Sequence, residues 1–300
     1  MSKKSAALGC LVTMALLVCA TPSAAQRKAT SVDGSLAYSH VQKLVAFGPR
    51  PPGSPAIAKS QAYIADVLKK LGLQVEHQDF LASTPNGPVS MKNIVGKTEQ
   101  SGRSVVILAS HYDTRLMTNA AFVGANDGGS STGLLLELAR VLSPRRNAFT
   151  VWFVFFDGEE AQREWSETDS LYGSRYFVEK LKADGQTQVI KAMVLMDLVG
   201  DRDLKLENDA SSTPQLMELV RKSAVELGYS KNLAASQKGM VDDHIPFIRA
   251  GIPAVDLIDF DYGFNLWHTP NDTLDKISPH SLKIVGDIAV RTLENLSQRP

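Results

Sequence analysis

Runs of largely apolar residues mark the predicted strands of this chain. They lie at 105–108, 151–156, 194–198 and Ala254–Ile258. Such a run is typical of a strand buried on both faces, usually a central strand of a parallel sheet. Further strands are expected at 73–80 and 93–96, with a turn at 84–88 between them.

Helix signals separate these runs. Ser54-Pro55 is a strong helix start, because serine caps the first turn and proline fits its first position. Apolar residues then keep helical spacing up to Gly72, which fits the C-terminal stop. Other helices are predicted at 133–142, 171–181 and 214–227, and from Ser278-Pro279 onward. The pattern predicts one α/β domain, with a central, mostly parallel, twisted sheet and helices on both faces.

The first residues have the composition of a secretory signal peptide. Lys3 and Lys4 precede an apolar stretch that is too short to cross a bilayer comfortably, and small residues before Gln26 form a cleavage site. We therefore predict a signal peptide over residues 1–25, a single catalytic domain over residues 26–300, and a secreted or periplasmic protein. A lipid anchor is disfavoured, since Cys10 lies too early and Cys19 follows Val18 rather than a small residue.

Composition narrows the partners of the mature chain. Lysine plus arginine (32) balances aspartate plus glutamate (32), so nothing indicates nucleic acid or an anionic membrane surface. Both cysteines lie in the signal peptide, which leaves neither disulfides nor thiol chemistry. We expect a monomer with no membrane anchor in the mature chain.

Two adjacent glutamates follow the most apolar run. The chain breaks after residue 156 at Asp157-Gly158 and continues with Glu159 and Glu160. In open α/β sheets, active-site residues usually lie beyond the carboxyl ends of the strands. There, one carboxylate of a pair can ligate a metal and the other can transfer a proton. An isolated acidic pair is more often a solvated turn, but here other predicted strands are followed by similar residues.

Residues near other strand ends extend this pattern. His111 follows one strand, with Asp113 placed to orient it. Asp197 lies in apolar surroundings, where a carboxylate is costly unless it is paired or metal-bound. The full set is His111, Asp127, Glu160, Asp197 and His268. Two imidazoles and three carboxylates suit zinc; Asp127 could bridge two ions, with Glu159 as the proton carrier. Any one of them could be an ordinary polar loop residue, but five at comparable positions make that reading weaker.

The order of these motifs resembles the zinc aminopeptidase superfamily. His-x-Asp is followed by Asp-Gly-Gly, Asp-Gly-Glu-Glu, a buried strand Asp and a late Trp-His-Thr. Within the superfamily the sequence is more similar to the animal-type glutaminyl-peptide cyclotransferases, over roughly residues 47–277. Similar cyclases share the insertion at 161–170 that carries Trp165, the paired aspartates before His244, and Trp267 directly before His268. An apolar cage of tryptophans suits a small neutral carboxamide.

The resemblance implies a set of roles. One zinc would be bound by Asp127, Glu160 and His268, and would polarise the γ-carboxamide of an N-terminal glutamine. Glu159 would accept the proton of the attacking α-amine and return it to departing ammonia. Asp197 and Asp243 would hold the substrate amine, and Trp165 and Trp267 would line its pocket. The substrates would be N-termini of peptides or proteins, and Gln26 itself would become pyroglutamate after signal cleavage.

Two alternatives remain open. If His111 and Asp197 hold a second zinc, Glu159 would activate water and the protein would be a di-zinc aminopeptidase. Some members of the superfamily are binding domains that lost the metal, but here every ligand position is filled. Two features depart from the animal cyclases: the disulfide cysteines are absent, and the segment 256–265 is unusually acidic.

Overall fold

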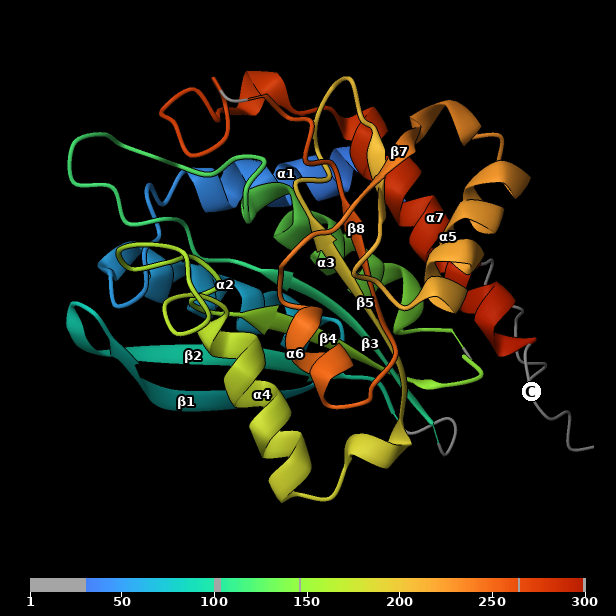
Figure 1. Ribbon diagram of the computed structural model, residues 1–300, viewed down its shortest axis with the longest axis horizontal. Coiled ribbons are helices and arrows are strands. Elements are labelled where there is room, and N and C mark those ends of the chain that lie inside the picture. Colours follow the sequence, from blue (N-terminus) through green and yellow to red (C-terminus); the bar gives the residue numbers. More distant parts are fainter. Residues whose placement is uncertain (1–30, 100–103, 146, 264, 299–300) are drawn as a thin grey trace, which may run out of the picture.

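The computed structural model describes residues 31–99, 104–145, 147–263 and 265–298 (Figure 1). The predicted signal peptide, Cys10, Cys19 and the expected new N-terminus at Gln26 lie outside the described residues. Within the described ranges, no helix is both long and apolar enough to cross a membrane.

A six-stranded mixed sheet organises the domain. Its strands stand in the order β1 (Gln74–Thr84), β2 (Gly87–Lys97), β4 (Thr150–Phe156), β3 (Val105–His111), β5 (Ile190–Asp197) and β8 (Ala254–Ile258). The last four are mutually parallel, as predicted, whereas β1 and β2 form an antiparallel hairpin beside β4. The two groups differ because β3, β4 and β8 are buried at every position, while β1 is exposed or half-buried along most of its length.

Helices cover both faces of this sheet. One core cluster joins it to α1 (Gly34–Val45), α2 (Pro55–Lys70), α3 (Gly129–Leu142), α5 (Pro214–Glu226) and α7 (Pro279–Ser297). A second cluster joins the opposite face to α4 (Tyr172–Ala183) and α6 (Ile245–Arg249), which lie on the near side in Figure 1. The arrangement confirms the predicted α/β class with helices on both faces.

Local signals fixed most helix ends. Ser54 Oγ accepts a hydrogen bond from the Ile57 amide at 3.1 Å, and Gly72 follows α2 with a φ of +78°. Helix α3 begins four residues earlier than predicted, because Gly128, at a φ of +69°, turns the chain directly into a first turn of small residues. Such a turn gives no apolar periodicity.

A small parallel sheet was not predicted. It consists of β6 (Leu206–Asp209) and β7 (Leu233–Lys238), and β7 has no buried position. Short 3-10 turns lie at Thr187–Val189, Ser230–Asn232 and Leu274–Lys276. Without a buried face, β7 lacks the hydrophobic pattern by which a strand is recognised.

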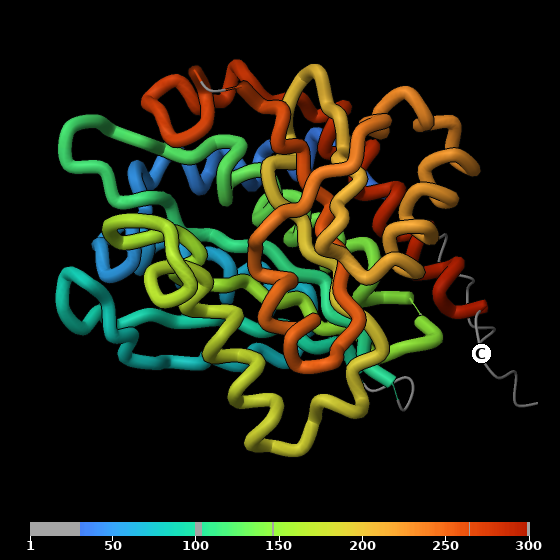
Figure 2. The backbone as a smooth tube through the Cα atoms, in the orientation of Figure 1, coloured from blue at the N-terminus to red at the C-terminus, as the bar shows by residue number. Residues whose placement is uncertain are grey.

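The parallel strands end at one common edge. His111 is paired with Phe156 in register, and Asp197 is paired with Ile258. Three long loops continue from this edge, at 112–128, at 157–171 and at 259–263 with 265–272, and Figure 2 shows all three on the same side of the molecule. Residues distant in sequence thereby come together beyond the strand ends.

Candidate metal centre and active site

His111 ends β3 and is enclosed by acidic groups. Its Nε2 lies 3.1 Å from Asp197 Oδ1 and 3.2 Å from Asp127 Oδ1, and its Nδ1 lies 3.5 Å from Asp113 Oδ1. Burial alone would lower the pKa of His111, but the adjacent Asp197, Asp113 and Asp127 outweigh burial and raise that pKa well above its usual value. The Asp113 contact matches the orienting role expected from the sequence.

Asp127 bridges the two imidazoles. While Oδ1 faces His111, Oδ2 lies 3.3 Å from His268 Nε2. The glycine before α3 permits this approach, because a Cβ on Gly128 would lie 2.6 Å from the Asp113 carbonyl oxygen. Burial raises the pKa of Asp127, but the two histidines outweigh it and hold the pKa below its ordinary range. Asp127 therefore remains ionised between its two partners.

Glu160 and His268 complete the first donor set. Glu160 Oε1 lies 3.1 Å from His268 Nε2, and the glutamate side chain is buried. Burial, followed by the nearby Asp127 charge, raises the pKa of Glu160 to about 7. The loop holding Glu160 is fixed by Asp113, whose carboxylate accepts hydrogen bonds from the Glu159 and Glu160 amides at 3.1 and 3.3 Å.

These contacts have the character of metal ligation. Asp127 Oδ2 and both Glu160 oxygens are buried and make no contact with hydrogen-bond geometry, although His268 Nε2 is close. Ligands bound about 2 Å from one tetrahedral ion lie roughly 3.3 Å apart, which matches these separations. Two donor groups converge in this way: Asp127, Glu160 and His268, and His111, Asp127 and Asp197. The residues present therefore fit zinc.

The two donor groups differ in how well the protein already satisfies them. Asp197 Oδ1 accepts hydrogen bonds from His111 Nε2 at 3.1 Å and from the Leu198 amide at 2.8 Å. By contrast, the Glu160 carboxylate has no hydrogen-bond donor. The Asp127–Glu160–His268 group thus has the stronger need for a cation.

Glu159 lies beside this centre without belonging to either group. Its carboxylate is buried 4.0 Å from His111 Nδ1. Burial raises the pKa of Glu159 well above its ordinary value; His111 opposes this, and the charges of Asp242, Glu160 and Asp243 add to it. A carboxyl group with a raised pKa can exchange a proton near neutrality.

The paired aspartates after β7 face different neighbours. Asp243 Oδ1 accepts a 2.5 Å hydrogen bond from Ser174 Oγ, whereas Asp242 lies in the field of Asp197 and against the carboxyl group of Asp256. Burial and the Asp197 charge raise the pKa of Asp242 to about 6. The sequence favoured Asp243 for the site, and the structure adds Asp242, whose pKa is raised by the Asp197 charge.

A buried cluster behind Asp242 was missed by the sequence analysis. Asp256 projects from β8, His244 Nδ1 lies 3.9 Å from Asp256 Oδ2, and His244 Nε2 lies 3.2 Å from Asp209 Oδ2. Burial, with the charges of Asp242 and Asp197, raises the pKa of Asp256 well above its usual value. An aspartate within the apolar run Ala254–Ile258 carried the same signal that singled out Asp197.

The two predicted tryptophans are placed differently. Trp267 stacks on the His268 ring, with centroids 3.9 Å apart, and meets Phe260 edge-on at 5.2 Å. Trp165 is 41% exposed, on a loop that Asp169 organises by accepting hydrogen bonds from the amides of Gln162, Arg163 and Glu164. Only Trp267 contacts a candidate ligand in this structure.

Backbone strain is concentrated around the site. Among the described residues, the non-glycine residues with positive φ are Leu171, Leu198 and His268, at 54°, 50° and 52°. Leu198 follows Asp197, and the Leu171 amide donates to the Glu159 carbonyl at 2.8 Å. Such conformations persist where the surrounding structure imposes them, which is typical of functional sites.

A twisted α/β sheet that brings buried, unpartnered carboxylates next to imidazoles beyond its strand ends is typical of metal-dependent enzymes. Residues 93–293 match Peptidase family M28. The chain belongs to this family and, within it, to the glutaminyl-peptide cyclotransferases. This confirms the predicted fold and family.

Individual relatives support that placement. A glutaminyl-peptide cyclotransferase-like protein of Bos taurus is 32% identical over 260 residues, which cover 77% of this chain and 67% of the relative. The crystal structure of a glutaminyl cyclase from an Acidobacteriales bacterium is 40% identical, with a TM-score of 0.87 over 94% of this chain and all of that one. A leucine aminopeptidase precursor from Bacteroides thetaiotaomicron is 26% identical, with a TM-score of 0.82 over 89% of this chain and 99% of that one.

Proposed function

We propose that this chain converts the N-terminal glutamine of peptides or proteins to pyroglutamate with release of ammonia, using one zinc ion held by Asp127, Glu160 and His268. The observation that carries the single-ion assignment is the contrast between the donor groups. Glu160 is buried without a hydrogen-bond donor, whereas Asp197 is already bonded to His111 and to the Leu198 amide. When bound, zinc supplies a Lewis acid for the γ-carboxamide oxygen of the substrate.

Glu159 is the proposed proton carrier. It is a buried carboxylate next to the donor set and belongs to neither candidate metal group. Its raised pKa suits a group that accepts the proton of the substrate α-amine and later returns it to the leaving ammonia. The amine and the amide it attacks belong to the same residue, so the nucleophile is already tethered and its effective concentration is high.

The substrate amine is assigned to the acidic side of the site. Asp242 and Asp243 lie near Glu159, and Asp197 lies near Asp242. At least one of these carboxylates can receive a hydrogen bond from an ammonium group. Trp267 and Trp165 are proposed to cover the apolar part of the glutamine side chain. Because Trp165 is exposed on the loop at 161–170, it would lose water contact when substrate binds.

A second candidate function rests on the second donor group. His111, Asp127 and Asp197 also converge, and a leucine aminopeptidase precursor shares the fold. With two ions, Glu159 would activate a water molecule and the chain would release N-terminal residues.

One experiment separates the two. Purified mature protein loaded with zinc is incubated with a glutamine-initiated peptide and with matched alanine- and leucine-initiated peptides, and the products are weighed by mass spectrometry. Loss of ammonia from the glutamine peptide alone supports cyclisation. Shortening of all three by one residue contradicts the proposal and identifies an aminopeptidase. Glu159→Gln serves as the control, because it preserves shape and removes the proton acceptor.

The cellular assignment is part of the same proposal. We infer a cleavable signal peptide over residues 1–25 and a secreted or periplasmic, monomeric enzyme formed by residues 26–300. Cleavage would expose Gln26 as a substrate of the enzyme's own activity. Intact-mass measurement of the exported protein should show a pyroglutamyl N-terminus, and an unmodified glutamine after long incubation contradicts this.

A further inference from the structure

Arg115 contacts the outer nitrogen of a proposed zinc ligand. Its Nη1 lies 2.9 Å from His268 Nδ1, on the ring edge away from the Nε2 atom that faces Asp127 and Glu160. Within the described part of the chain, Arg115 forms no ion pair with a carboxylate. The guanidinium therefore contacts the imidazole ring of His268 rather than a carboxylate.

This contact has the wrong polarity for a zinc-bound histidine. A neutral imidazole that binds metal through Nε2 carries its proton on Nδ1, and it normally donates that proton to a carboxylate, carbonyl or water. Arginine has only donors, so it cannot accept that proton. Two N–H groups would then face each other, and the guanidinium charge would also lie close to a dication.

We propose that Arg115 opposes zinc binding at His268, so that the guanidinium must leave Nδ1 when the metal loads. This inference rests on the ligand set of the proposed function. Arg115 is only half-buried and precedes Leu116, which is 40% exposed, so solvent is available to the displaced side chain. Until it is displaced, the resident arginine lowers the zinc affinity of the group formed by Asp127, Glu160 and His268.

Zinc affinity itself is the test. Metal-free wild type, Arg115→Gln and Arg115→Met are titrated with zinc in competition with a chromophoric chelator. The glutamine variant places an amide oxygen where it can accept the Nδ1 proton, so we expect its zinc affinity to rise by about 10-fold or more. The methionine variant removes the charge without adding an acceptor, and should fall between the glutamine variant and wild type.

Arg163→Gln is the matched control. Arg163 is exposed and its guanidinium contacts Asn86 and the Pro85 carbonyl, away from the donor groups, so its replacement should leave zinc affinity unchanged. Equal or weaker zinc binding by Arg115→Gln overturns the proposal; weaker binding would mean that the arginine supports the ligand. Cyclisation of a glutamine peptide by zinc-saturated wild type is scored separately, so failure of the proposed function is distinguishable.

Discussion

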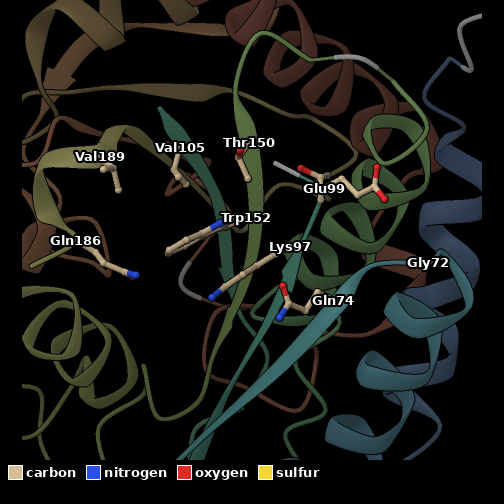
Figure 3. A pocket seen from close by; sticks show the side chains of 10 residues that line it. Gly72, Gln74, Lys97, Glu99, Val105, Thr150, Trp152, Gln186 and Val189 are labelled. Atoms are coloured by element: carbon tan, nitrogen blue, oxygen red, sulfur yellow. The ribbon is translucent and has the colours of Figure 1, made fainter. Parts of the chain in front are cut away.

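The two ends of the parallel strands differ in whether their charged side chains have partners. At the amino end, a cavity of about 420 Å³ is lined by residues that include Gln74, Lys97, Trp152, Gln186 and Val189 (Figure 3). Lys97 is satisfied there: its Nζ lies 2.7 Å from Glu76 Oε2 and 4.3 Å from the centre of the Trp152 ring. At the carboxyl end, Asp127 Oδ2 and the Glu160 carboxylate are buried near His268 without a hydrogen-bond partner.

The difference shows that unsatisfied charge, rather than volume, marks the reactive end of this molecule. A paired lysine beside an open cavity needs no ligand to be stable. Buried, unpartnered carboxylates are costly, and they are tolerated where a cation or a proton completes them. If this comparison is correct, substitutions at the carboxyl end should change metal binding and rate, and substitutions at the amino end should not.

The largest effect is expected from Glu160→Gln. A neutral amide is a poor zinc ligand, so the variant should lose its metal and at least about 1,000-fold in kcat/KM, since Lewis-acid catalysis contributes several kcal/mol. Metal content and kinetics are measured on the same preparation. Full activity with zinc retained would remove Glu160 from the ligand set.

Glu159→Gln should come next. Loss of a general base typically lowers rate by about 100- to 10,000-fold, here with zinc content unchanged. The contrast with Glu160→Gln separates proton transfer from metal binding at adjacent positions. Concurrent loss of zinc would show that Glu159 belongs to the metal centre instead.

Asp242→Asn and Asp243→Asn form a matched pair. Because the Asp242 charge raises the pKa of Glu159 more than the Asp243 charge does, neutralising Asp242 should move the acid limb of the kcat/KM profile further toward low pH. Asp243→Asn should instead reduce stability by about 1–3 kcal/mol, through its hydrogen bond with Ser174. The opposite ranking in the pH profiles would restore Asp243 as the principal partner of Glu159.

Stability of the metal-free protein should depend on pH through acids such as Asp259. Burial raises the pKa of Asp259 to about 7, from an ordinary value of 3.8. Between pH 4 and 7 the unfolded chain loses this proton while the folded chain retains it, so stability falls as pH rises, by up to about 1.4 kcal/mol per unit. Urea unfolding at pH 4, 6 and 8 should show a weaker decline for Asp259→Asn; parallel curves would contradict the assignment.

The smallest effect is expected at the amino end. Lys97→Met removes a partly exposed ion pair and a cation–π contact, which together are worth about 1 kcal/mol. Thermal unfolding should show this loss of stability. Both kcat/KM and zinc affinity should stay within about twofold of wild type, a change of less than about 0.5 kcal/mol. A clear change in rate would mean that the cavity in Figure 3 communicates with the metal centre.

Much of the fold followed from local pattern. The strand Ala254–Ile258 was predicted with the bounds observed, and the capping serine at residue 54 and the glycine at residue 72 delimit α2 as expected. These signals are local, because a strand buried on both faces shows as a short apolar run and a helix end shows as a capping residue. Strand β7 and the small sheet escaped prediction because they leave no such mark.

The residues of the candidate centre could be named from the sequence. His111 and Asp197 end parallel strands and Glu160 follows one closely, so these three were expected to meet at the shared edge. Asp127 and His268 lie further along loops, and the structure brings them to the same place. The tertiary structure alone decided the environment of each. Arg115 contacts His268 across 153 residues, and burial together with the Asp197 charge raises the pKa of Asp242. Such contacts depend on loop paths and side-chain packing between distant segments, which no local pattern specifies.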